Sequence, residues 1–167
     1  MTRSGSCDVP KLAAAAAVLL LWPVAGRAAP AFDAGRDGEL VLSGGNWALA
    51  IDAATGAIRR IEDRTAAGAI LRGGPDLWRI GRHDAESVVS SDCTFRHDWD
   101  AEKAELTLVF DGPEAAVRIV CEAADEGPLW RSEVAMKRGT MVEWRFPARL
   151  EFDAGDIAEF VLPDHLG

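Results

Sequence analysis

The segment Asn46-Trp-Ala-Leu-Ala-Ile-Asp-Ala-Ala-Thr-Gly-Ala-Ile-Arg-Arg-Ile-Glu-Asp63 decides the fold class of this chain. Trp47, Leu49 and Ile51 alternate with smaller residues, which is the period-2 pattern of a strand with one buried face. Asp52-Ala-Ala-Thr-Gly56 has the composition of a tight turn, and a second apolar run follows it. The segment therefore predicts a β-hairpin.

Short alternating segments continue along the rest of the chain, and they recur about every 8–12 residues with turns between them. After residue 28 we find no helical periodicity over ten or more residues. The pattern predicts an all-β, antiparallel β-sandwich. In the segment 141–146, Val142, Trp144 and Phe146 are expected to point inward. Further strands are predicted at residues 39–43, 69–71, 77–80, 86–89, 93–99, 104–110, 115–123, 129–137, 149–153 and 159–162.

Residues 1–28 have the pattern of a signal peptide, which we expect to form a helix. Arg3 and Lys11 precede an apolar run of about eleven residues, and small residues follow up to Ala28. We expect a Sec-type signal with cleavage near Ala28, and a secreted or periplasmic protein that leaves the membrane after cleavage. A signal anchor is the alternative, although the run is short for a span of about 20 residues.

The remaining chain divides into a flexible lead-in, residues 29–38, and a single domain, residues 39–167. The formal net charge is −9 at pH 7. Such an acidic chain repels phosphate groups, which argues against nucleic acid and anionic membranes as partners. Cys93 and Cys121 are both expected to point inward. An oxidising compartment permits a disulfide between them, and two separate buried thiols are the equal alternative.

Four motifs in order resemble the galactose-mutarotase-like β-supersandwich domains that lie at the N-terminus of large secreted glycoside hydrolases. The first is Asp-x-x-Thr-Gly in the predicted hairpin. The others are Gly74-Pro-Asp-Leu-Trp-Arg-Ile80, Val142-Glu-Trp-Arg-Phe-Pro147 and Leu162-Pro-Asp-His-Leu-Gly167. The motifs are distributed in this order along most of residues 39–167. The resemblance implies a partial supersandwich that is incomplete at its C-terminus, a fragment lacking the catalytic (β/α) barrel that follows in the family.

Tryptophans are the natural candidates for carbohydrate contact, because the C–H face of a pyranose packs on a flat indole. Trp47, Trp130 and Trp144 share strand faces with aliphatic residues and are expected in the core. Trp78 and Trp99 lie near strand ends and are the candidates for sugar contact, against a competing core role.

Asp164 and His165, in the predicted C-terminal loop, are weaker candidates for carbohydrate contact. No His/Cys spacing typical of a metal site and no nucleophile motif occurs in the sequence. We therefore expect no metal, no cofactor and no catalytic residues. The resemblance would offer a His and a Glu as proton-transfer groups, but no histidine here lies in such a motif.

These observations favour a non-catalytic, carbohydrate-associated β-sandwich module of a secreted glycoside-hydrolase-type protein. Its expected partners are carbohydrate or the missing barrel domain. One alternative is a free-standing enzyme of the aldose-mutarotase type. The other is an extracytoplasmic carbohydrate-binding or adhesion domain.

Overall fold

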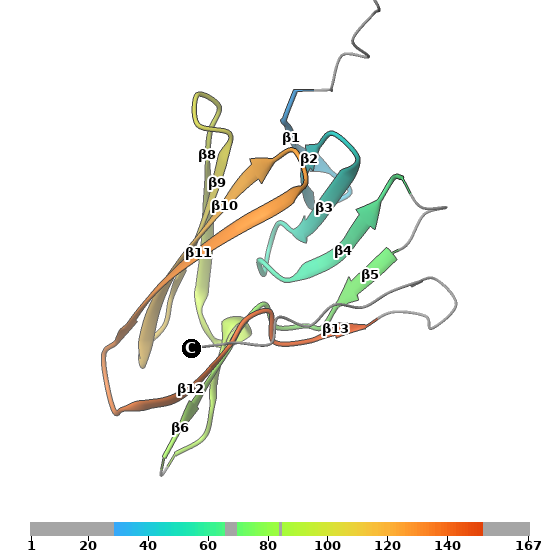
Figure 1. The fold of residues 1–167 in the computed structure, drawn as a ribbon. Coiled ribbons are helices and arrows are strands. Elements are labelled where there is room, and N and C mark those ends of the chain that lie inside the picture. Colours follow the sequence, from blue (N-terminus) through green and yellow to red (C-terminus); the bar gives the residue numbers. More distant parts are fainter. Residues whose placement is uncertain (1–28, 66–69, 84, 152–167) are drawn as a thin grey trace, which may run out of the picture.

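The computed structural model describes residues 29–65, 70–83 and 85–151, and it is an antiparallel β-sandwich, as the sequence predicts (Figure 1). Every strand pairing in this part of the chain is antiparallel. The elements are β1 (Ala31–Arg36), β2 (Glu39–Gly44), β3 (Trp47–Asp52), β4 (Ile58–Asp63), β5 (Ile70–Gly73), β6 (Arg79–Arg82), β7 (Val88–Val89), a 3-10 turn (Ser90–Asp92), β8 (Thr94–Asp100), β9 (Glu105–Asp111), β10 (Ala115–Ala124), β11 (Gly127–Met136), β12 (Met141–Arg145) and β13 (Leu150–Glu151).

Two large sheets face each other. The first has the strand order β1-β2-β3-β4-β5-β13, and the second has the order β11-β10-β9-β8. A small third sheet, β12-β6-β7, lies below them in Figure 1. The facing sides of the two large sheets share one hydrophobic core, to which the first contributes Leu42 and Leu49 and the second contributes Leu108 and Ile119.

The hairpin predicted from the opening segment is confirmed, and Asp52 closes its turn. Asp52 Oδ1 accepts hydrogen bonds from the backbone N–H groups of Ala54 and Thr55, both at 2.9 Å. The Gly56 N–H donates to the Asp52 carbonyl at 2.8 Å, and Gly56 has a φ of +74°. A φ in this region is readily adopted by glycine and strained for other residues, so the Asp/Thr/Gly composition fits the geometry of the turn.

One expectation about β3 is wrong, because the strand is buried on both faces. Ala48 and Ala50 lie on the side away from the core, yet they are only 5% and 1% exposed. Ala50 pairs with Arg60 on β4, and Ala48 pairs with Glu62. The longer side chains of Arg60 and Glu62 form an ion pair at 2.6 Å on this outer face. Short alanine side chains between such neighbours lose their solvent contact without being part of the core.

The predicted flexible lead-in, residues 29–38, is also a wrong expectation. Residues 31–36 form β1, which pairs with β2 in a register that places Phe32 opposite Leu42. Asp37 and Gly38 form the two-residue connection, with φ values of +55° and +69°. An Asp-Gly pair with positive φ at both positions is a strong hairpin signal. Asp37-Gly38 therefore marks β1 as the first strand of a hairpin with β2.

The inward direction predicted for Val142 is wrong, because its side chain is 60% exposed. The pairing of β12 with β6 shifts between Met141 and Glu143, so Val142 is an extra residue in the strand. A β-bulge of this kind inserts an extra residue and interrupts the alternation of side chains, so Val142 points outward. Trp144 and Phe146 still pack against the core, as predicted.

The alternation predicted for the second sheet is confirmed. Leu106, Leu108 and Phe110 of β9 are all 0% exposed. The intervening side chains of β9 point to the outer face of the sheet, because successive residues of a strand face opposite sides. The predicted signal peptide, the predicted strand at 159–162 and the final family-like motif lie outside the described residues. In the described part of the chain, no helix has the length and apolar character that a membrane crossing requires.

Candidate functional site

Trp78, a predicted carbohydrate contact, is a core residue in the structure. Its side chain is 0% exposed and packs edge-on against the Phe110 ring, with ring centroids 5.6 Å apart. Leu77 and Ile80 beside it are also buried. A sugar in solution cannot reach this indole, which corrects the prediction. The Trp78 Nε1 has no hydrogen-bond partner among the described residues.

Trp99 is half-buried near the other end of the sandwich. It stacks on Phe32 of β1, with ring centroids 5.1 Å apart and an angle of 19° between the rings. Phe32 also lies 6.5 Å from the ring of His97 on the same strand as Trp99, so its ring packs against β8. The Phe32 ring therefore occupies one side of the Trp99 indole. Asp164 and His165, the other two predicted contacts, lie outside the described residues.

Cys93 and Cys121 are free thiols in the structure. The strand register explains why they are not bridged. Cys121 of β10 is level with Leu106 of β9, which in turn pairs with Trp99 of β8. Cys93 immediately precedes β8, so it lies six residues along that strand from the level of Cys121. At about 3.4 Å per residue this separation far exceeds the roughly 7 Å that a disulfide can span between Cα atoms.

A row of three aromatic side chains, Trp130, Phe146 and Trp144, lies where the second sheet meets the third. We call it the aromatic row. The Trp130 and Phe146 rings are 5.2 Å apart at 70°, and the Phe146 and Trp144 rings are 6.2 Å apart at 10°. Trp144 is in turn 5.8 Å from the buried Trp78. The row thus extends the core outward as a continuous set of rings.

All three rings of the aromatic row, which the sequence predicts to point inward, pack against the core but remain half-buried. Trp130 is on the inner face of β11, and this strand is the last of its sheet in the described part of the chain. On the same face of β11, Val134 and Met136 are also half-buried, and Ser132 is exposed. Sequence alternation assigned these side chains to the inner face correctly. It carried no information on whether another strand covers them.

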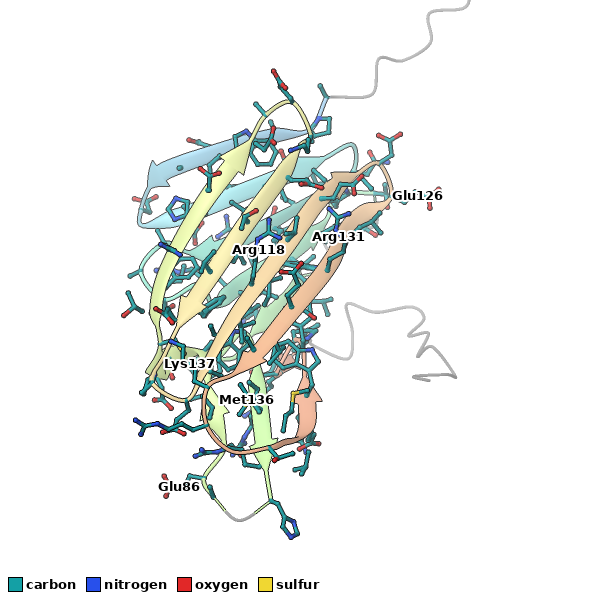
Figure 2. The ribbon with its side chains drawn as sticks, turned by 90° about the vertical axis from the view of Figure 1, so that its left-hand side faces the viewer. Glu86, Arg118, Glu126, Arg131, Met136 and Lys137 are labelled. Atoms are coloured by element: carbon teal, nitrogen blue, oxygen red, sulfur yellow. The ribbon has the colours of Figure 1, made fainter. Side chains whose placement is uncertain are left out.

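The outer face of the second sheet carries charged side chains in cross-strand rows (Figure 2). Arg131 forms an ion pair with Glu105, and Arg118 forms one with Glu133 at 3.7 Å. These four side chains surround Val120, which is 6% exposed, and line a shallow depression of about 260 Å³. Both arginines and Glu133 are about half exposed or more. Exposed ion pairs of this kind contribute about 0–1 kcal/mol each, so the surface is a solvated face.

The aromatic row is a half-buried apolar cluster packed against the core, and Ser132 is exposed on the same face of β11 as Trp130. No candidate metal site is present in residues 29–65, 70–83 and 85–151, because no group of three His, Cys, Asp or Glu side chains there could hold an ion. Comparison with protein-family models, curated proteins and solved structures finds no match for this chain.

Proposed function

We propose that this domain is a non-catalytic, carbohydrate-associated β-sandwich module of a secreted glycoside-hydrolase-type protein, with the aromatic row as its sugar-contacting surface. The observation that carries the proposal is the half-buried state of Trp130, Phe146 and Trp144. Export and the glycoside-hydrolase context rest on residues 1–28 and on the family resemblance of the sequence.

The geometry of the aromatic row suits a pyranose ring. Trp144 and Phe146 are stacked on each other within 10° of parallel, so a sugar would pack on the ring faces and edges that this stack leaves uncovered. Trp130 meets Phe146 at 70° and forms a side wall. Aromatic side chains bury large areas at little entropic cost, and a nearby hydroxyl can orient the ligand by hydrogen bonding. Ser132 supplies such a hydroxyl on the inner face of β11.

A binding role also agrees with the chemistry of the aromatic row. Stacking of a sugar on aromatic rings needs no proton transfer, so the row can act without a titratable group. Within a larger protein, such a module would hold a glycan chain beside a catalytic (β/α) barrel. That barrel, or carbohydrate itself, is the partner that we propose.

The proposal is tested by titrating the purified protein with glucose-based and galactose-based oligosaccharides while tryptophan fluorescence is recorded. We expect a saturable change that is lost in Trp130→Ala and Trp144→Ala. Leu129→Ala is the matched control, because Leu129 is 57% exposed on the opposite face of β11. Circular dichroism spectra would verify that each variant is folded.

Two results would contradict the proposal. One is the absence of any saturable change with the unsubstituted protein. The other is an equal loss of binding in Leu129→Ala, which would show that the aromatic row is not the contact surface. A coupled assay of sugar anomer interconversion addresses the enzymatic alternative, and turnover by the protein would overturn the non-catalytic assignment.

A further inference from the structure

The free edge of β11 is the longest regular strand edge in the described part of the chain. β11 has ten residues and pairs with β10 along its whole length without a register shift. On its other side no strand is hydrogen-bonded within the described residues. An open edge of this kind presents a row of backbone donors and acceptors that can pair with another strand.

The register identifies which backbone groups point to this free edge. Ala124 and Gly127 flank a two-residue turn, and the Lys137 N–H donates to the Glu114 carbonyl at 2.8 Å. Odd-numbered residues of β11 therefore direct their N–H and C=O groups toward β10. In an antiparallel ladder the alternate residues point the other way. These residues are Trp130, Ser132, Val134 and Met136, together with Pro128.

Pro128 supports this assignment. Proline has no N–H, and within sheets it is confined to positions where the missing donor would point away from a partner strand. Pro128 belongs to the outward-pointing set, so the pairing of β11 with β10 loses nothing.

Other free edges of the described sheets carry features that oppose pairing. β7 and β13 have two residues each, and both β1 and β12 contain a register shift. β8, at the opposite side of the second sheet, has seven residues, including the charged Arg96, Asp98 and Asp100. Short length, bulges, charge and proline are the usual protections of sheet edges, and of these β11 has Pro128, near its start. On its outer face, β11 also carries one positive and one negative side chain, Arg131 and Glu133.

We infer that β11 pairs antiparallel with β11 of a second copy of this chain, around a twofold axis that passes through Ser132. In this register Arg131 of each copy lies opposite Glu133 of the other on the outer face. On the inner face Trp130 of each copy lies opposite Val134 of the other. The second sheet then runs continuously through both copies.

Charge selects this register over its neighbours. A shift of the axis to residue 131 would place the two Arg131 side chains directly opposite each other. A shift to residue 133 would place the two Glu133 side chains opposite each other. Like charges in directly opposite positions destabilise a strand pair, and opposite charges stabilise it. Arg131 and Glu133 are 64% and 74% exposed, and within one copy they pair with Glu105 and Arg118, so pairing across the free edge exchanges these exposed contacts for contacts with the second copy.

The contact is self-complementary, as an interface around a twofold axis requires. Each copy offers the same outward N–H and C=O groups, the same ion pair and the same aromatic–aliphatic pair. The pairing also adds cover beside Trp130, which is half-buried in one copy. It goes beyond the proposed sugar binding and needs no ligand.

The test uses charges placed on the twofold axis itself. Ser132 is exposed, and Ser132→Lys or Ser132→Glu would place like charges opposite each other in a pair of identical copies. By sedimentation velocity we expect the unsubstituted protein to be a dimer. Each variant alone should dimerise with an affinity at least tenfold lower. A one-to-one mixture of the two variants should restore the dimer, because Lys then lies opposite Glu.

Thr94 provides the matched control. It is exposed and begins β8, the strand at the opposite edge of the same sheet. Thr94→Lys and Thr94→Glu should leave the dimer intact. A monomeric unsubstituted protein at about 100 μM would overturn the inference, as would a mixture of the Ser132 variants that stays monomeric although both are folded.

Amide hydrogen exchange distinguishes a second copy from the chain's own residues as the partner of β11. The N–H groups of Trp130, Ser132 and Val134 should become protected as protein concentration rises. Protection that is already complete in a dilute monomer would show that another segment of the same chain covers the edge, and it would overturn the inference. These measurements contain no sugar, so their failure is separate from a failure of the proposed function.

Discussion

The indole Nε1 of Trp47 donates a hydrogen bond to the carbonyl oxygen of Ala124 at 2.8 Å. Trp47 begins β3 in the first sheet, and Ala124 ends β10 in the second, so the bond joins the two layers of the sandwich. Gly44 makes the contact possible, since a Cβ at this position would lie 2.4 Å from the Trp47 Nε1. A single indole thus provides both core packing and a polar link between sheets.

Replacement of Trp47 should reveal both contributions. Trp47→Phe retains an aromatic ring but leaves the partly buried Ala124 carbonyl without its donor, which should lower the free energy of unfolding by about 1–3 kcal/mol. Trp47→Ala also removes the buried ring and should cost about 3–5 kcal/mol. Urea unfolding curves measure both values. Equal stability of Trp47→Phe and the unsubstituted protein would show that the hydrogen bond contributes nothing.

The turn residue Gly56 should tolerate no side chain. A Cβ there would lie 2.6 Å from the Phe95 ring and 2.7 Å from the Phe110 ring, in addition to the strain of a φ of +74°. We expect Gly56→Ala to destabilise the protein by about 2–4 kcal/mol in thermal or urea unfolding.

Gly38 is the control for this substitution. It has a φ of +69°, but nothing lies within 4 Å of a Cβ built there. Gly38→Ala should therefore show only the backbone cost, about 1 kcal/mol. If the two alanine variants lose equal stability, the aromatic contact at Gly56 is not the cause.

Asp52 should make stability depend on pH in the acid range. Its hydrogen bonds with Arg59 are the largest cause that lowers the Asp52 pKa from 3.8 to about 2, and the Thr55 and Ala54 N–H groups add to it. Because the folded pKa is the lower one, the stabilisation is complete above pH 4 and is lost as the pH falls toward 2. It amounts to about 1–2 kcal/mol, after allowance for solvent around Arg59, which is 41% exposed.

The variant Asp52→Asn isolates this effect. It should unfold more easily than the unsubstituted protein at pH 7, and the difference between the two should shrink between pH 4 and pH 2. The other carboxylates titrate in both proteins, so the difference in the urea midpoint reports Asp52 alone. A difference that stays constant with pH would contradict the assignment of the low pKa to this residue.

The two described cysteines should differ in reactivity. Cys121 is 0% exposed, and burial strongly raises the pKa of its thiol. Cys93 is half-buried, and its pKa is raised mainly by burial and further by Asp92 and Asp111. Since the thiolate is the reactive form, an alkylating reagent at pH 7.5 should label Cys93 slowly and Cys121 only after unfolding. Peptide mapping checks the sites, and rapid labelling of Cys121 in the folded protein would contradict the structure.

Local sequence determined the main hairpin and the inner and outer faces of the second sheet. The period of a strand is enough to predict the burial of Leu106, Leu108 and Phe110. The turn at Asp52 depends only on local hydrogen bonds and one glycine. Strand β1 can also be predicted from local sequence, because Asp37-Gly38 is a hairpin signal. The residues that precede this pair are few and mostly small or polar, so they show no clear strand pattern.

Tertiary structure alone decided the candidate site. Alternation places Trp130 and Trp144 on inner faces and leaves Trp78, near a strand end, unassigned, but it cannot tell that Trp78 is enclosed and that the other two lie at the border of the described sheets. That difference depends on strand order, which places β11 last among the described strands of its sheet through pairings between distant segments. The bulge at Val142 likewise arises from the pairing of β12 with β6. A side chain's direction is a property of its own strand, whereas its cover depends on which other strands pack nearby.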